Sequence, residues 1–228
     1  MNAVTEPLRV DRPAKTLREL TLEKMREAIF SQHFRPGDRL VERDLCERLG
    51  VSRTIVREVL RHLETEGLVS NLPARGPIVS RTTAAEALQI YEIRGALEAI
   101  AARACAEARE PATIAALDAC LARILAGYAR GNSTLVLEAT SDFYRTLFAC
   151  SGKEIAWNIV NSLTMRINHL RSMTIKTPGR EVEGPKQMQR IVEAIRAGKA
   201  EDAHAAALQH VASASVIAQR LLQERAGG

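Results

Sequence analysis

The chain has 228 residues, of which 46% are hydrophobic, 26% are charged and only 4% are aromatic. This is an ordinary composition for a soluble globular protein of one large or two modest domains, and its richness in Ala, Leu, Arg and Glu favours helices and argues against a β-sandwich. The formal net charge of +5 permits a polyanionic partner but does not require one.

The cysteine spacing and the first 15 residues indicate in which cellular compartment the protein is expected. The four cysteines, at positions 46, 105, 120 and 150, show no CxxC spacing, so we expect buried thiols and neither a disulfide framework nor a zinc ribbon. Residues 1–15 lack the apolar centre of a secretion signal, and no apolar run approaches the roughly 18 residues of a membrane span. We therefore expect a cytoplasmic protein whose first 15 residues form a flexible arm.

The first folded segment is predicted to be a helix from Thr16 to Ser31, because apolar residues recur there at helical spacing. A turn at residues 35–38, RPGD, separates it from a short helix over residues 42–49. Gly50 suits the end of that helix because glycine readily adopts positive φ. Ser52 then stands where an N-cap belongs, so a further helix is expected to begin directly after it.

The helix after Ser52 is predicted to have two contrasting faces. Its apolar residues fall within one arc of about 140° when they are placed at 100° per residue. The opposite arc carries Arg53, Thr54, Arg57 and Arg61. Guanidiniums along one face suit a major groove, where arginine can donate two hydrogen bonds to guanine or bind phosphate. The alternative is an ordinary surface helix with arginines at i, i+4.

The segment that follows favours the DNA-contacting interpretation. Residues 66–81, EGLVSNLPARGPIVSR, contain two short apolar runs around a turn and predict a β-hairpin, or wing, with residues 74–76 at its tip. A cation at the tip, Arg75, is placed to reach phosphate or the minor groove. Pro77 lacks an N–H group, so the second strand is expected to lie at an edge.

These stretches resemble the winged helix-turn-helix of the GntR family of bacterial transcription regulators over residues 16–81. The resemblance is carried by RPGDRL at 35–40, SRTIVREVLRHLETEGLV at 52–69 and RGPIV at 75–79. It implies that the DNA contacts come from one helix and its neighbours together with the wing tip. The residues assigned to this role are Arg43, Ser52, Arg53, Thr54, Arg57, Arg61, Arg75 and Gly76.

The composition changes after Ser80, and the rest of the chain has a helical pattern without strand-like alternation. We place the domain boundary at residues 81/82 and predict an antiparallel helical bundle over residues 82–225. The protein is thus expected to be mainly α, with a winged module and an all-α domain. The predicted bundle helices are 83–109, 111–130, 132–151, 154–176, 185–197 and 200–224, with a loop at 177–184.

This second half resembles the FadR-type C-terminal effector domain, also called the FCD domain. The resemblance rests on YEIRGALEAIAARACA at 91–106, DFYRTLFACSG at 142–152 and IVEAIRAGKAEDAHAAALQHV at 191–211. It implies a homodimer that binds a palindromic DNA operator, most simply as a repressor, under the control of a small carboxylate-bearing effector.

The metal site common in such domains is not matched here. The four positions that would hold a divalent ion read Thr140, Tyr144, Met188 and His210, of which only the last is a usual ligand, so we expect no metal and no other cofactor. We expect these four residues to line an effector pocket instead. A histidine that is simply hydrogen-bonded in the core is the alternative for His210.

Arg94 is the fifth residue assigned to the effector, because the resemblance places an arginine there and a guanidinium can bind a carboxylate in bidentate fashion. The alternative is a plain surface ion pair with Glu98 at i, i+4. We find no nucleophile–base pair, phosphate loop or ligand cluster, so an enzyme is not expected. A helical-domain enzyme and a scaffold with a vestigial pocket remain the alternative functions.

Overall fold

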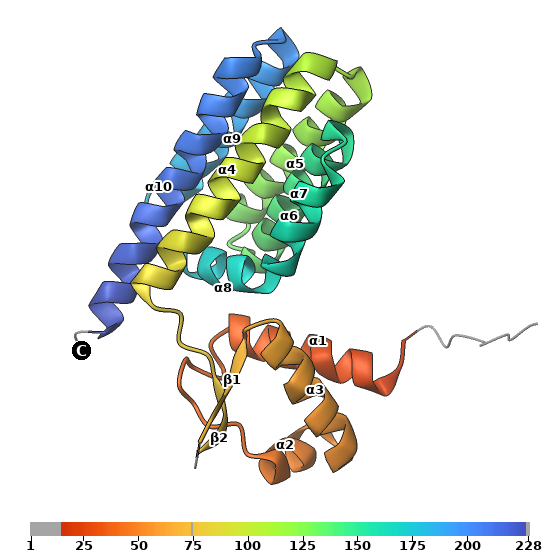
Figure 1. The fold of residues 1–228 in the computed structure, drawn as a ribbon, viewed down its shortest axis with the longest axis vertical. Coiled ribbons are helices and arrows are strands. Elements are labelled where there is room, and N and C mark those ends of the chain that lie inside the picture. The colour runs from red at the N-terminus through yellow and green to blue at the C-terminus, as the bar shows by residue number, and fades with distance from the viewer. Residues whose placement is uncertain (1–14, 74, 227–228) are drawn as a thin grey trace, which may run out of the picture. The chain divides into compact units, whose positions relative to one another are not determined.

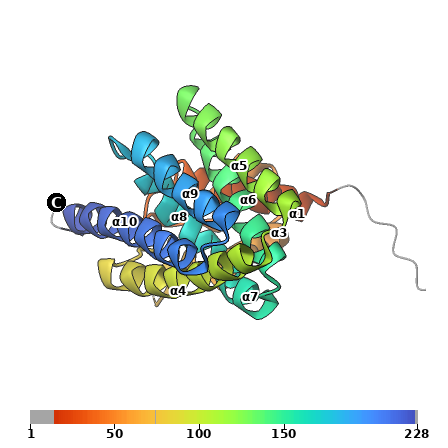
Figure 2. The same cartoon turned by 90° about the horizontal axis from the view of Figure 1, so that it is seen from above.

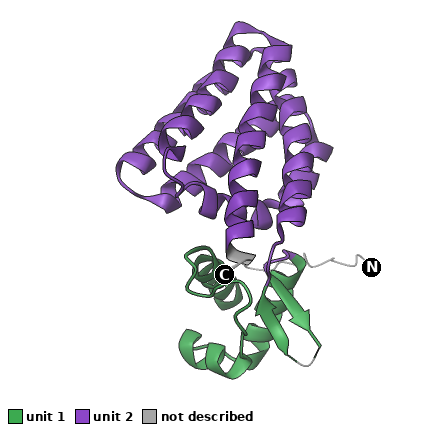
Figure 3. Ribbon diagram, turned by 90° about the vertical axis from the view of Figure 1, so that its left-hand side faces the viewer, with its two compact units in different colours: residues 1–65, 69–79 green, residues 66–68, 80–228 purple. Residues whose placement is uncertain are grey.

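A computed structural model describes residues 15–73 and 75–226. The predicted arm at residues 1–15 falls almost entirely outside this range, so it stays a prediction. The chain divides into two compact units, one of residues 1–65 and 69–79 and the other of residues 66–68 and 80–228 (Figure 3). Each unit has its own set of buried hydrophobic side chains.

The first unit contains the predicted helices and hairpin (Figure 1). Thr16 caps the first helix in a capping box with Glu19, and Gly50 ends the second with φ of 66°. The two strands pair antiparallel, with Val69 opposite Val79 and Leu72 opposite Gly76. The elements are α1 Leu17–Phe30, α2 Glu42–Leu49, α3 Arg53–Thr65, β1 Val69–Leu72 and β2 Gly76–Val79.

The core of this unit lies where α1, α2 and β1 pack against α3. The buried face of α3 is the predicted one, with Val56, Val59, Leu60 and Leu63 all buried. In α1, by contrast, Leu20 is exposed, although it belongs to the apolar set that predicted this helix. The buried side chains of α1 are those of Thr21, Leu22, Met25 and Ile29.

The second unit is a bundle in which α4 and α10 lie side by side along much of their length (Figures 1 and 2). Thr83 caps the first of these with Glu86 in a second capping box, and Arg109 ends it in the left-handed region. The bundle helices are α4 Ala84–Ala108, α5 Pro111–Ala129, α6 Ser133–Ser151, α7 Glu154–Ser162, α8 Thr164–Thr174, α9 Arg180–Ala197 and α10 Ala200–Ala226.

Two predicted bundle elements are wrong in detail. The single helix predicted over residues 154–176 is two helices, α7 and α8, which meet at Leu163. The predicted loop at 177–184 ends early, because α9 begins at Arg180 and contains Pro185 in its interior. Gly179, with φ of 83°, occupies the N-cap position, and acidic residues in the first turn suit the positive end of the helix dipole.

Helix α5 is apolar and long enough to span a membrane, which differs from the expectation drawn from the sequence. One such helix is weak evidence, because core helices of soluble proteins pass the same test of length and composition. Leu117, Leu121 and Ile124 of α5 lie in the bundle core, and 33% of its apolar stretch is buried.

The cysteines are all free thiols, but only Cys105 and Cys120 are buried. Cys46 and Cys150 are partly exposed, so the expectation of buried thiols is wrong for those two.

Candidate functional site

The outer face of α3 carries the predicted guanidinium groups. Arg53, Arg57 and Arg61 are all exposed, as is Thr54 beside them. The opposite face of the helix is buried, so this helix cannot turn its arginines inward without losing its core. Ser52 stands at the predicted N-cap position, where its hydroxyl accepts a long hydrogen bond of 3.4 Å from the N–H of Ile55.

Helix α2 adds a carboxylate that reasoning from the sequence did not consider. Nε of Arg57 donates to both carboxylate oxygens of Glu42, at 3.0 and 2.9 Å. This ion pair links α3 to α2 at the surface. A phosphate or base that binds Arg57 would compete with Glu42 for the guanidinium. Arg43 also lies on α2, is highly exposed, and approaches Asp44 at 3.5 Å.

The hairpin supplies the remaining predicted cation. Arg75 is exposed, and Gly76 adopts φ of 73°, a conformation that favours glycine because it has no Cβ atom. Ala74, the other residue assigned to the wing tip, lies outside the described residues. Together these positions place exposed cations on α2, α3 and the hairpin of one small module.

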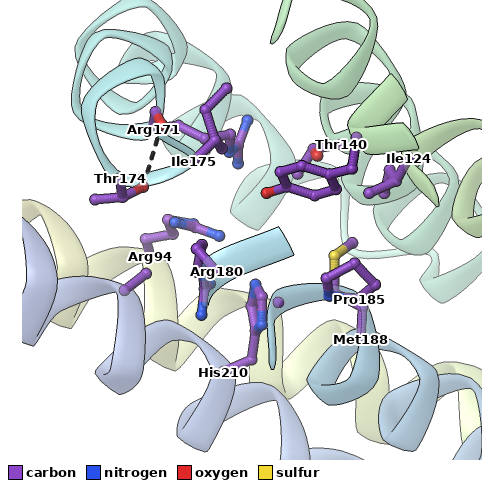
Figure 4. Close-up of a pocket in the computed structure, with 13 residues that line it drawn as sticks. Arg94, Ile124, Thr140, Arg171, Thr174, Ile175, Arg180, Pro185, Met188 and His210 are labelled. Atoms are coloured by element: carbon purple, nitrogen blue, oxygen red, sulfur yellow. Dashed lines mark hydrogen bonds between the residues drawn. The ribbon is translucent and has the colours of Figure 1, made fainter. Parts of the chain in front are cut away.

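The bundle contains a cavity of about 30 Å³, which is room for roughly two water molecules. Side chains from α4, α9 and α10 point toward one another there, as Figure 4 shows for Arg94, Arg180 and His210. The lining residues are Arg94, Ile124, Tyr128, Thr140, Arg171, Thr174, Ile175, Arg180, Gly184, Pro185, Met188, His210 and Ala214.

Four of the five residues assigned to the effector line this cavity, namely Arg94, Thr140, Met188 and His210. Tyr144 does not line it, but it is buried nearby, and the guanidinium carbons of Arg94 and Arg171 lie 5.0 and 5.4 Å from its ring centroid. The Thr140 hydroxyl donates to the Val136 carbonyl at 2.7 Å, which ties it to its own helix.

Arg94 is predicted either to bind the effector or to form a surface ion pair with Glu98, and its surroundings fit parts of both predictions. It does pair with Glu98, with 2.6 Å between Nε and Oε1, but both side chains are at most 2% exposed. A surface ion pair is therefore the wrong description. Burial disfavours the charged guanidinium, yet the adjacent carboxylate outweighs this effect and raises the pKa of Arg94.

Two further buried arginines were not identified from the sequence. Arg171 on α8 donates to Asn168 Oδ1 at 2.8 Å and to Ser141 Oγ at 3.4 Å, and Arg180 on α9 donates to Gln187 Oε1 at 3.1 Å. Burial lowers the pKa of Arg171 to about 10, with Arg94 adding to the effect, and burial also lowers the pKa of Arg180. Because the arginine side chain is not deprotonated in proteins, both groups carry a positive charge.

His210 is a buried imidazole without a partner on Nδ1 among the residues that the structure describes. Burial lowers its pKa well below the usual range, and the guanidiniums of Arg180, Arg94 and Arg171 act in the same direction. The imidazole is therefore neutral at physiological pH and presents one unsatisfied nitrogen in the cavity wall.

The residues present do not fit a divalent metal ion. In the described part of the chain, no three His, Cys, Asp or Glu side chains are grouped closely enough to hold one. Three guanidiniums line the same space and would repel a cation. The neighbouring acid Asp142 is engaged elsewhere, with Arg123 at 2.7 Å and Arg145 at 3.0 Å.

Comparison with known families resolves the identity of both units. The model for bacterial regulatory proteins of the gntR family matches residues 17–78, and the FCD domain model matches residues 89–213, more than half of the chain. The chain belongs to the GntR family. This GntR protein is accordingly a DNA-binding transcriptional regulator with an FCD domain.

Individual relatives agree with this assignment. The Nta operon transcriptional regulator of Aminobacter aminovorans is 33% identical over 142 residues, which is 62% of this chain and 67% of the relative. The repressor RspR of Escherichia coli is 24% identical over 93% of both chains.

The fold of this GntR protein also matches solved structures. McbR/YncC of E. coli has a TM-score of 0.74 at 20% identity, covering 91% of this chain and 99% of that one. A putative GntR regulator from Rhodococcus sp. RHA1 has a TM-score of 0.73 at 24% identity, covering 87% and 95%. At these identities the likeness concerns the fold alone.

Proposed function

We propose that this GntR regulator is a cytoplasmic repressor that binds a palindromic operator as a homodimer and is controlled by a small organic acid held in the FCD cavity. The main support is that the chain has two separate sets of guanidiniums. One set is exposed on α3, and the other is buried around a cavity in the bundle. The first set suits DNA, and the second suits an anion.

The DNA half of the proposal is supported by the geometry of α3. An amphipathic helix with exposed arginines at i, i+4 and i+8 can enter a major groove while its buried face stays attached to the module. Arg43 on α2 and Arg75 beside β2 add exposed cations to the same module, which suits phosphate contacts. Two copies on a palindrome would place their reader helices about 34 Å apart.

The effector half rests on the lining of the cavity. Guanidiniums bind carboxylates with charge-assisted hydrogen bonds, and His210 offers a further unsatisfied nitrogen. Because the cavity has a volume of only about 30 Å³, an organic acid must displace lining side chains as it binds. Such displacement favours a different arrangement of the bundle helices, and a ligand that binds one arrangement better shifts the population toward it.

The DNA contacts are tested by Arg53→Ala and Arg57→Ala in a gel-shift titration on an operator selected from random duplexes. Each substitution is expected to weaken binding by about 1 to 3 kcal/mol, because base or phosphate contacts are lost. Both side chains are exposed, so circular dichroism should not change. The melting temperature should stay the same for Arg53→Ala and change only slightly for Arg57→Ala, because the exposed pair with Glu42 contributes at most about 1 kcal/mol. Arg190→Ala, an exposed substitution on α9, serves as the control, and unchanged operator affinity in both test variants would remove these arginines from the reader role.

The effector role is tested by thermal unfolding with a panel of organic acids. An acid at 100 times its Kd should stabilise the protein by about 2.7 kcal/mol and also alter operator affinity. Turnover of an acid would favour the alternative of a helical-domain enzyme. Stabilisation by none of them would favour a scaffold with a vestigial pocket.

A further inference from the structure

The buried charges around the cavity do not balance. Three guanidiniums, those of Arg94, Arg171 and Arg180, are at most 8% exposed. Glu98 is the single buried carboxylate among the residues described for the bundle. Three cations against one anion leave two positive charges inside the bundle. Charges removed from water without a partner are costly, so an excess of this kind calls for a compensating group.

The excess can be assigned to particular residues. Glu98 is already taken by Arg94, at 2.6 Å. Arg171 and Arg180 donate only to neutral oxygens of Asn168, Ser141 and Gln187, and within the described ranges no carboxylate lies within 4.0 Å of either guanidinium. Neutral acceptors satisfy some of the N–H groups but do not cancel the charge.

The packing around Arg180 shows that its buried position is accommodated by the local sequence. A Cβ atom added at Gly184, one turn further along α9, would lie 3.3 Å from Nε of Arg180. Any larger residue at that position would crowd the guanidinium. The lack of a side chain at Gly184 therefore leaves room for Arg180 beside the cavity.

We propose that the cavity binds a small dianion, whose two negative charges compensate Arg171 and Arg180 while His210 adds a hydrogen bond. This inference rests on the proposed effector role of the cavity and adds a requirement for two charges. The shared chemistry fits either a short dicarboxylate or a phosphate group, since both present several anionic oxygens to guanidinium donors. A neutral imidazole can donate one hydrogen bond to either ligand.

The charge requirement is tested on the intact protein by isothermal titration at constant ionic strength. The probes are dicarboxylates from malonate to adipate, the monoamide of each, acetate and inorganic phosphate. Each monoamide keeps the length of its parent acid and loses one charge. We expect the best dicarboxylate, or phosphate, to bind at least about tenfold more tightly than the best monoanion, because truncating one partner of a buried charge pair is strongly unfavourable.

The arginines are tested by Arg171→Met and Arg180→Met, with Arg190→Met as a matched control at an exposed position of α9. Removing an uncompensated buried charge should raise the melting temperature of the ligand-free protein and reduce dianion affinity at least about tenfold. The control should change neither quantity. A lower melting temperature in both test variants together with unchanged dianion affinity would overturn the proposal.

The outcomes separate this inference from the proposed function. A monoamide that binds as tightly as its parent diacid overturns the two-charge requirement and leaves an organic-acid effector standing. Binding of none of the carboxylates, with phosphate bound, supports the dianion but rejects the organic acid. Binding of no anion at all overturns both. These titrations use the unmodified protein, so they decide the question even if a substitution prevents folding.

Discussion

At the scale of single residues, the two halves of the protein use the same side chain in opposite ways. The arginines of α3 are exposed on the face opposite the core, so water solvates their charges. The three arginines that line the bundle cavity are buried, and two of them, Arg171 and Arg180, have only neutral partners. The first arrangement suits a large polyanion that arrives from solvent, whereas the second suits a small anion that enters the protein.

His210 gives a residue-scale prediction about pH. Its pKa is lowered in the folded state, so below about pH 6.5 the unfolded chain binds a proton that the folded chain does not. Stability should therefore fall as the pH drops through that value, by at most about 1.4 kcal/mol between pH 7.5 and 5.5 for this one group.

Urea denaturation at several pH values measures this dependence. His210→Gln should flatten it, while His204→Gln, a partly exposed histidine on the same helix, should leave it unchanged. An identical pH dependence in wild type and His210→Gln would show that the buried imidazole is not the group responsible.

At the scale of secondary-structure elements, helix ends place the cavity residues. Arg180 is the first residue of α9 and follows the Gly179 cap. Proline suits the first turn of a helix, which favours helices that begin at Pro111 and at Pro185. Helix α5 does begin at Pro111, but Pro185 lies inside α9 despite a local cost of about 3 kcal/mol. The packing of α9 against α10, α5 and α4 must offset that cost, because the local sequence disfavours it.

The cap of α4 gives an element-scale prediction. The Thr83 side chain accepts from the Glu86 N–H, and the Glu86 carboxylate accepts from the Thr83 N–H at 2.8 Å. Thr83→Ala should lower the free energy of unfolding by about 1 kcal/mol, because the Glu86 N–H loses the hydroxyl that accepts its hydrogen bond.

The matching change in melting temperature is about 2 to 4 °C, measured by calorimetry. Thr82→Ala, one residue outside the cap, is the control. Equal effects of the two substitutions would mean that the capping box contributes nothing specific to α4.

At the scale of the whole molecule, the protein joins a module with an exposed cationic helix to a bundle with a buried cationic cavity. Members of this family are typically dimers that bind DNA. In the proposed homodimer, both reader helices must meet the same face of the duplex, because a half-site out of phase loses phosphate and base contacts together.

Half-site phasing gives the prediction at this scale. Inserting five base pairs between the half-sites of a selected operator moves them to opposite faces of the duplex. Affinity in a gel shift should then fall more than about tenfold, toward that of a single half-site. Undiminished affinity for the expanded operator would argue against two readers acting from one rigid dimer.

The sequence by itself determined the DNA-contacting half almost completely. The boundaries of α2, the N-cap at Ser52 and the buried face of α3 all follow from capping and helical periodicity within about 25 residues of chain. Such signals are local, so they do not depend on how distant segments pack. They also predict a hairpin within residues 66–81, whereas its register is known only from the structure.

The tertiary structure alone decided the charge of the cavity. Arg171 lies on a helix that was expected to be part of a longer one, and Arg180 lies in a segment expected to be a loop. Whether a guanidinium is buried, and whether a carboxylate reaches it, depends on which helices pack around it. Helical periodicity describes one helix at a time. It therefore cannot show that α4, α8 and α9 bring three arginines to one cavity, or that a buried carboxylate pairs with only one of them.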